Sequence, residues 1–117
     1  MADKFDWDEA KKFLQEKEAK DKQQKENERI ALLQKVISIL KDEFNGTGVE
    51  VYLIGSILQP FRFTKRSDVD IVLKNFKGDL FDLWSPLEHK IDWQIEIIIF
   101  EKSRLQEFVL KEGLRVI

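Results

Sequence analysis

The chain has 117 residues, 43% of them hydrophobic, which suits one domain with a modest core. It has no cysteine and a single histidine, His89, which excludes disulfides, cysteine-based zinc sites and multi-histidine metal sites. Any metal should therefore be a hard cation held by carboxylates. With a net charge of −2, we expect no direct nucleic-acid binding, and no apolar run approaches the roughly 20 residues of a membrane span. The N-terminus lacks the pattern of a signal peptide, so a cytoplasmic protein is expected.

Residues 1–28 are predicted to form a charged helical extension. Between Gln15 and Arg29 the only apolar residue is Ala19, and acid-before-base pairs at i,i+4, such as Glu16 with Lys20, favour a helix. The segment has no apolar stripe with which to bury itself. Its far end carries large apolar side chains that could dock on a partner, on a second copy or on the domain itself: Trp7, Phe13 and Leu14. A disordered, solubilising tail is the alternative.

An amphipathic helix is expected next, because apolar residues recur at steps of three and four and Asn45-Gly46 provides a stop. The predicted stripe is Ile30, Leu33, Ile37, Leu40 and Phe44.

The remainder has the pattern of an α/β domain, which we place at residues 29–117. Strands are predicted at 49–54, 69–73 and 91–100, with an edge strand at 114–117. Residues 80–88 are expected to be a short helical or irregular link, since Pro86 makes the form of that segment uncertain. Residues 103–112 are expected to be a helix that ends at Gly113 and points Leu105, Phe108 and Val109 inward. The predicted fold is a short mixed sheet flanked by helices.

Gly55-Ser56 ends the first buried strand. Glycine lets a ligand approach the backbone closely, and such a turn can aim amide groups and the serine hydroxyl at a phosphate. The dipeptide is also an ordinary turn sequence, so taken alone it does not identify a site.

Asp68 and Asp70 flank Val69 at the start of the second strand. Carboxylates at i,i+2 project to the same side of a strand, where they could hold a divalent cation that grips phosphate oxygens. Solvated acids at a strand start are the alternative, which suits Asp68 better than Asp70, because Asp70 is followed by three apolar residues.

Glu96 is a carboxylate within the apolar run of the third strand, which indicates a site shared with Asp68 and Asp70. Three close carboxylates would repel, so at least one should have a raised pKa. Asp92, on the same predicted face, is the alternative third ligand, and a surface Glu96 paired with a lysine is the alternative role for Glu96.

Together, Gly55-Ser56, an eleven-residue gap, Asp68-Val69-Asp70 and a later strand carboxylate resemble the signature of the DNA polymerase beta nucleotidyltransferase superfamily. The nearest resemblance is to its minimal nucleotidyltransferases. It implies that Gly55 and Ser56 contact a nucleoside triphosphate, expected to be ATP. It also implies that Asp68, Asp70 and Glu96 are catalytic and bind two Mg²⁺ ions.

The resemblance implies transfer of a nucleoside monophosphate to an acceptor hydroxyl. In the minimal nucleotidyltransferases the acceptor is a tyrosine of a helical HEPN-type ribonuclease toxin, which the enzyme silences as its antitoxin. Here too the expected partner is a HEPN-type protein or a second copy of the chain. A degenerate module that acts by binding its partner is the alternative, and modification of a small molecule is a third reading.

The chain departs from the family pattern after the Gly-Ser turn. Leu58 and Pro60 occupy the region in which relatives often carry an arginine and a glycine, and Pro60 should cut short any helix that starts at Ser56. Arg62, Lys65 and Arg66 could steady phosphates in place of that arginine, or they could simply solubilise the surface.

Overall fold

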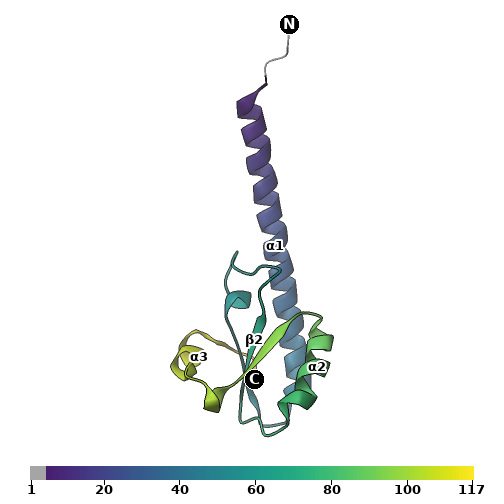
Figure 1. Ribbon diagram of the computed structural model, residues 1–117, viewed down its shortest axis with the longest axis vertical. Helices are drawn as coiled ribbons and strands as arrows, with labels where there is room; N and C mark the ends of the chain where they lie inside the picture. The colour runs from purple at the N-terminus through teal and green to yellow at the C-terminus, as the bar shows by residue number, and fades with distance from the viewer. Residues whose placement is uncertain (1–4) are drawn as a thin grey trace.

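The computed structural model describes residues 5–117, so the first four residues of the predicted extension lie outside it. A long helix is followed by an α/β body (Figure 1). In chain order the elements are α1 (Trp7–Phe44), β1 (Glu50–Ile54), the 3-10 turn η1 (Ser56–Leu58), β2 (Val69–Lys74), α2 (Leu80–Ile91), β3 (Ile95–Ile99), the 3-10 turn η2 (Phe100–Lys102), α3 (Gln106–Glu112) and β4 (Leu114–Arg115).

The described residues form a mixed four-stranded sheet in the order β3-β2-β1-β4. The central strand β1 is antiparallel to both β2 and β4, whereas β2 and β3 are parallel. This arrangement brings the end of β1 beside the starts of β2 and β3. The predicted class, a small α/β fold with a short mixed sheet, is confirmed.

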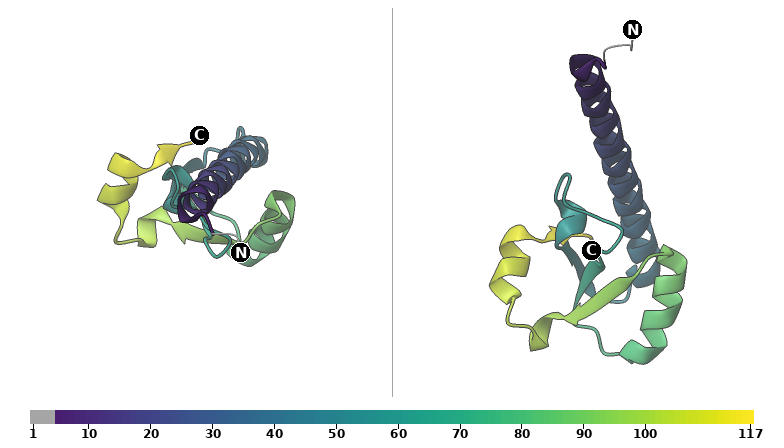
Figure 2. Two further views of the ribbon diagram at one scale, coloured as in Figure 1. Left: turned by 90° about the horizontal axis from the view of Figure 1, so that it is seen from above. Right: turned by 45° about the horizontal axis from the view of Figure 1, so that its top comes forward.

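Helices cover the two faces of the sheet unequally (Figure 2). On one face, α1 and α2 enclose the larger core, which includes Leu40 and Phe44 of α1 and Leu87 and Ile91 of α2. On the other face, α3 inserts Val109 into a smaller cluster with Tyr52, Ile54, Val72 and Phe100. Because side chains alternate along a strand, each strand residue faces either the larger core under α1 and α2 or the smaller cluster under α3.

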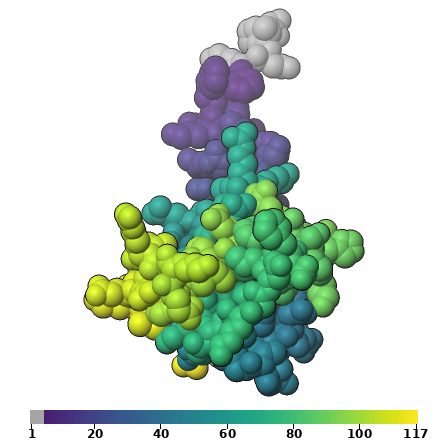
Figure 3. Space-filling model, turned by 60° about the horizontal axis from the view of Figure 1, so that its bottom comes forward, coloured from purple at the N-terminus to yellow at the C-terminus, as the bar shows by residue number. Residues whose placement is uncertain are grey.

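Helix α1 is continuous and only its C-terminal half packs on the body. Asp6 caps it by accepting a hydrogen bond from the amide of Glu9, and it ends before Asn45-Gly46, where Gly46 has φ of 74°. From Trp7 to Lys25 every residue except Ala10 is exposed. The protruding half makes the molecule 76 Å long but only 29 by 20 Å across (Figure 3). The predicted division at residue 28 falls inside this one helix.

The buried face of α1 overlaps most of the predicted stripe, since Leu33 and Ile37 also pack against the larger core. Leu40 and Phe44 are buried as expected, but Val36 and the charged pair Glu26 and Arg29 take the other buried places. Ile30 is 40% exposed, so its predicted core position is wrong. The sheet and the segment after η1 decide which face of α1 is buried. The pattern of apolar residues in the helix alone does not show where these neighbours lie.

Helix α2 is longer than predicted and β3 correspondingly shorter. Pro86 lies inside α2, which runs on through Ile91 and ends at Asp92 in the left-handed conformation. Residues 91–94, predicted as strand, therefore end the helix and form the connection to β3. Leu105 and Phe108 were also expected inward, yet both are more than two-fifths exposed, and only Val109 of that set is buried. None of the helices in residues 5–117 is long and apolar enough to cross a membrane.

Candidate functional site

The residues singled out from sequence lie at one end of the sheet, where β1 ends and β2 and β3 begin. In the register, Ile54 of β1 pairs with Asp70 of β2, and Asp70 pairs with Glu96 of β3. Because neighbouring strands lie roughly 4.8 Å apart, the backbones of Asp70 and Glu96 are close neighbours. Directly paired residues share a face, so both side chains project to the same side of the sheet.

That side is the face covered by α3. Ile71, the next residue after Asp70, faces the larger core against α1. Val72, two residues after Asp70 and on the same side of the strand, lies in the smaller cluster. Glu96 likewise alternates with Ile95 and Ile97, both in the larger core. The carboxylates therefore project away from α1, at the rim of the face on which α3 packs.

Gly55 lies directly against the carboxylate of Asp70. Its φ is 85°, and a Cβ placed on it would lie 2.5 Å from Oδ2 of Asp70. Only glycine combines this backbone conformation with this approach at low cost. Ser56 follows, half-buried, at the first position of η1. As expected from Pro60, the helical turn is short: Gln59, its C-cap, is already extended.

The backbone on both sides of Asp68 is fixed by the segment before β3. The carbonyl of Ser67 accepts hydrogen bonds from the Trp93 indole, at 2.7 Å, and from the Gln94 side chain, at 3.1 Å. The amide of Val69 donates to the carbonyl of Gln94 at 3.0 Å. Asp68 thus has an exposed side chain on an anchored backbone.

Mutual repulsion and burial perturb the central carboxylate. Burial, the largest cause, together with the negative charges of Glu96 and Asp68 raises the pKa of Asp70 to about 6. The expected raised pKa is thereby found, at Asp70. Among the ion pairs of residues 5–117, none involves any of these three carboxylates. Within residues 5–117, the negative charge of these carboxylates is therefore not balanced by an ion pair with a lysine or arginine.

The chemistry of this donor set suits Mg²⁺. The cation prefers carboxylate oxygens, and it usually takes one or two of them together with water and substrate phosphates. Over the described part of the chain, no three potential ligands converge closely enough to enclose a metal unaided. The residues present therefore fit a cation held jointly by Asp68, Asp70 and the phosphates of a nucleotide, with Glu96 adjoining.

Comparison with known families agrees with this geometry. Residues 8–108 match the family model described as "Poly(A) RNA polymerase, mitochondrial-like, central palm domain". The chain belongs to this family. The palm domain is a nucleotidyltransferase-type fold, so the general expectation of nucleotidyl transfer is supported. None of the curated proteins compared with the chain matches it. Membership of the minimal nucleotidyltransferases and an antitoxin role stay predictions.

Within the palm domain, Asp92 does not share the position of Glu96. It is the exposed left-handed cap of α2, with φ of 56°, rather than a residue of β3. The expectation that Asp92 lies on the same strand face as Glu96 is therefore wrong. Glu96 remains the carboxylate that the register brings beside Asp70.

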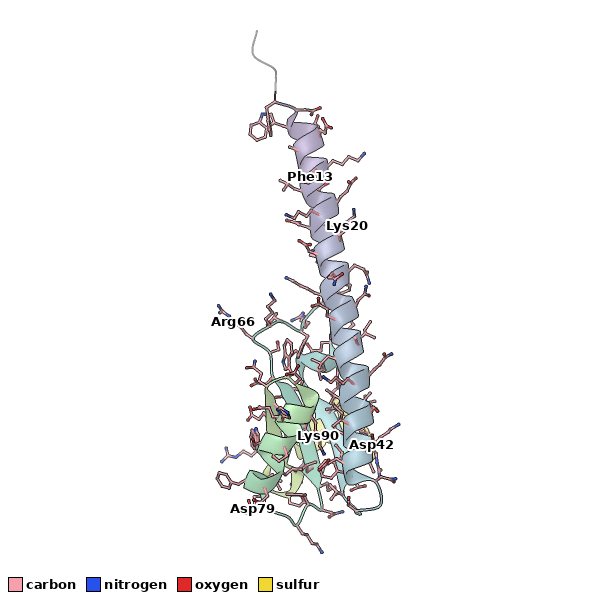
Figure 4. The ribbon with its side chains drawn as sticks, turned by 90° about the vertical axis from the view of Figure 1, so that its right-hand side faces the viewer. Phe13, Lys20, Asp42, Arg66, Asp79 and Lys90 are labelled. Carbon is pink, nitrogen blue, oxygen red and sulfur yellow. The ribbon has the colours of Figure 1, made fainter. Side chains whose placement is uncertain are left out.

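The three basic candidates lie on the loop between η1 and β2. Arg62, Lys65 and Arg66 are all exposed, and Arg66 projects from the outer tip of that loop (Figure 4). Lys65 helps to line a cleft of about 480 Å³ between the loop and α1, together with Phe63 and Trp93. Phe63 and Trp93 pack against the larger core, so this cleft opens on the face opposite the carboxylates. A phosphate-binding role for these three side chains stays a prediction.

Glu26 and Arg29 form a buried ion pair that the sequence analysis did not predict. Both are buried, and they contact the segment that follows Ser56. The available signal was the i,i+3 spacing of opposite charges about two and three turns before Val36, in phase with Val36 and Leu40. An acid and a base in a charged helix normally face solvent, so that signal carried little weight.

Proposed function

We propose that this palm domain is a Mg²⁺-dependent nucleotidyltransferase that transfers AMP from ATP to an acceptor hydroxyl. The observation that carries the proposal is the meeting of Gly55, Asp70 and Glu96 at one end of the sheet. The turn touches the central carboxylate, and the sheet register pairs that carboxylate with a second one. Membership of the palm-domain family supports the same reaction class.

Each residue has a definite task in this proposal. Ser56 and the first amides of η1 bind the triphosphate, which approaches closely because Gly55 has no side chain. Asp68 and Asp70 hold Mg²⁺, and Glu96 adds negative charge beside them. When bound there, Mg²⁺ would supply neutralisation of the phosphates and would lower the pKa of the attacking hydroxyl. The acceptor oxygen bonds to the α-phosphorus, the bond from that phosphorus to the bridging oxygen breaks, pyrophosphate leaves, and the hydroxyl proton passes to water.

Nucleotide binding gives the first test. Calorimetric titration with ATP and Mg²⁺ should show binding to the wild-type chain and at least tenfold weaker binding to Asp68→Ala/Asp70→Ala, because the phosphates lose the cation. Asp92→Ala is a matched control, since it removes an exposed carboxylate at the end of α2 and should bind like the wild type. Equal affinity for ATP with Mg²⁺ in the wild type and the double variant would refute the assignment of Asp68 and Asp70 to the binding site.

For the acceptor we propose a hydroxyl of a partner protein, by resemblance a tyrosine of a helical HEPN-type protein. The small net charge and the exposed Trp7, Phe13 and Leu14 on the free half of α1 support a protein partner over a polynucleotide. The second candidate is the 3′ hydroxyl of an RNA, because the matching family is described as a poly(A) RNA polymerase palm domain.

Labelled ATP distinguishes the two acceptors. ATP labelled at the α-phosphate should transfer its label to a co-expressed partner protein, and ATP labelled at the γ-phosphate should not. Label on a synthetic RNA, lengthened by single nucleotides, would instead identify RNA as the acceptor and refute the protein proposal. Asp68→Ala/Asp70→Ala should abolish transfer in either case.

A further inference from the structure

Helix α1 carries one buried ion pair, formed by Glu26 and Arg29. Each residue is only 7% exposed, although almost all residues that precede them in the helix are exposed. The Nε of Arg29 donates to both carboxylate oxygens of Glu26 at 3.1 Å. Burying two charges costs desolvation energy that their mutual attraction often fails to recover. Fold stability is therefore a weak explanation for this pair.

The same two side chains bind the backbone that follows Gly55-Ser56. Nη1 of Arg29 donates to the carbonyl of Ile57 at 2.7 Å. The amide of Phe61 donates to Oε2 of Glu26 at 2.8 Å. Hydrogen bonds to charged groups are roughly twice as strong as neutral ones. The pair thus grips this segment at two points, one on each side of Gln59-Pro60.

The segment held by this pair consists of two short turns, closed by hydrogen bonds to the carbonyls of Ser56 and Gln59, and its one fully buried side chain is Ile57. Its helical turn is brief, and Pro60 supplies no amide hydrogen. Phe61 has φ of 63°, a conformation that costs a bulky residue energy and persists only where surrounding contacts impose it. Its side chain is 65% exposed, so packing does not impose that conformation. Two hydrogen bonds hold it: the Arg62 amide donates to the Gln59 carbonyl at 3.2 Å, closing a turn around Pro60-Phe61, and the Phe61 amide donates to Glu26.

This segment adjoins the proposed nucleotide site. Ile57 follows Ser56 directly, and Gly55, one residue earlier, lies against Asp70. We propose that Glu26 and Arg29 are positioning residues that hold residues 57–61 and thereby set the Gly55-Ser56 turn against Asp70 for triphosphate binding. The inference rests on the proposed function.

The electrostatics support this arrangement. The hydrogen bond from Arg29 lowers the pKa of Glu26, and the amide of Phe61 lowers it further. Glu26 therefore stays ionised at neutral pH and keeps both of its contacts. Figure 1 shows the loop after η1 rising beside α1, as these contacts require.

The experiment must separate positioning from stability. Glu26→Leu/Arg29→Met removes both charges at similar volume, and such replacements of buried ion pairs commonly keep or raise stability. Arg29→Lys is a second variant that keeps the ion pair, but a lysine lacks the planar fork that serves Glu26 and Ile57 together. Glu43→Leu/Lys90→Met is the matched control, because that 2.7 Å pair joins α1 to α2 away from the turn.

Three quantities are measured on the full chain: the melting temperature, the exchange rate of the Phe61 amide and the Kd for ATP with Mg²⁺. For Glu26→Leu/Arg29→Met we expect a melting temperature near that of the wild type, at least tenfold faster exchange and at least tenfold weaker binding. Arg29→Lys keeps the hydrogen bond from Phe61 to Glu26 but loses the contact to Ile57, so we expect smaller changes in the same direction. The control should leave exchange and binding unchanged. Loss of binding at retained stability is the result that a purely structural pair would not give.

Other outcomes overturn the inference in distinguishable ways. Faster exchange with wild-type affinity would make the pair structural only. Weaker binding without faster exchange would show that the effect does not pass through the turn. Absence of ATP binding by the wild-type chain would overturn the proposed function itself, and the inference with it.

Discussion

Gly55 combines a left-handed backbone conformation with direct contact to the carboxylate of Asp70. Gly48 has nearly the same φ, 81° against 85°, but a Cβ added there would meet no atom within 4 Å. The two glycines therefore separate the cost of backbone strain from the cost of displacing Asp70.

We predict different results for Gly55→Ala and Gly48→Ala. Each should lose about 1 kcal/mol of unfolding free energy through its positive φ, and Gly55→Ala should lose more, because its Cβ would displace Asp70. Only Gly55→Ala should also weaken binding of ATP with Mg²⁺, by tenfold or more, because Asp70 must move. Urea unfolding and calorimetry measure the two effects. Wild-type binding by Gly55→Ala would show that contact between the turn and Asp70 is not needed.

The raised pKa of Asp70 predicts a pH-dependent loss of stability without metal. The folded protein holds this proton up to about pH 6, whereas the ordinary value is 3.8. As pH rises from below 4 through 6, the unfolded chain releases the proton first, and the folded state loses stability relative to it. Stabilisation from this group is thus complete below pH 4 and lost above pH 6.

Asp70→Asn keeps the shape of the side chain but cannot ionise, so it should not lose stability as the pH rises. At pH 7.5, with a chelator present, the variant should be more stable than the wild type by on the order of 1 kcal/mol, after allowance for screening of a partly exposed carboxyl. The difference should vanish below pH 4. Urea unfolding across pH 3.5–8 measures it. A difference that is the same at every pH would argue against a perturbed Asp70.

Helix α1 has two halves with different roles. Its C-terminal half supplies Val36, Leu40 and Phe44 to the core, whereas the residues before Glu26 are almost all exposed. We propose that the boundary between extension and domain lies before Glu26, nearer residue 20 than residue 28, because Glu26 contacts Phe61.

Two truncations test this boundary. Deletion of residues 2–20 should leave the melting temperature and ATP binding unchanged, since that part of α1 is exposed. Deletion of residues 2–28 also removes Glu26, and should cost on the order of 3 kcal/mol because it leaves Arg29 without its ion-pair partner. Calorimetric melting and titration of both chains give the comparison. If the longer deletion behaves like the shorter one, the domain begins after residue 28.

The local pattern of apolar and polar residues predicted the elements best where it fitted only one type of secondary structure. The run after Val49 and the acids flanking Val69 gave strands β1 and β2 nearly to the residue. The strand prediction was wrong at residues 91–94, because the alternating apolar residues there also fit the end of α2. The left-handed Asp92, which separates the helix from the strand, has no distinctive sequence signal. The buried pair of Glu26 and Arg29 depends on contacts 28 and 35 residues away, which no local pattern shows.

On the scale of the whole molecule, the proposed site and the free half of α1 lie at the same end. The sheet presents its carboxylates where β1 ends, and the protruding helix rises beside the loop that leaves that point (Figure 1). A partner bound along the exposed half of α1 would therefore lie near the nucleotide. This arrangement supports an acceptor delivered by a partner protein.

The central claim is that Gly55, Ser56, Asp68, Asp70 and Glu96 bind one metal–nucleotide complex. The most direct test is paramagnetic broadening of amide resonances by Mn²⁺ together with a non-hydrolysable ATP analogue, because broadening reports proximity to the ion. We predict that it centres on residues 55–56, 68–70 and 96, spares Trp7 and Phe13, and disappears in Asp68→Ala/Asp70→Ala. Broadening centred on the cleft between α1 and Lys65, or unchanged broadening in the double variant, would contradict the account.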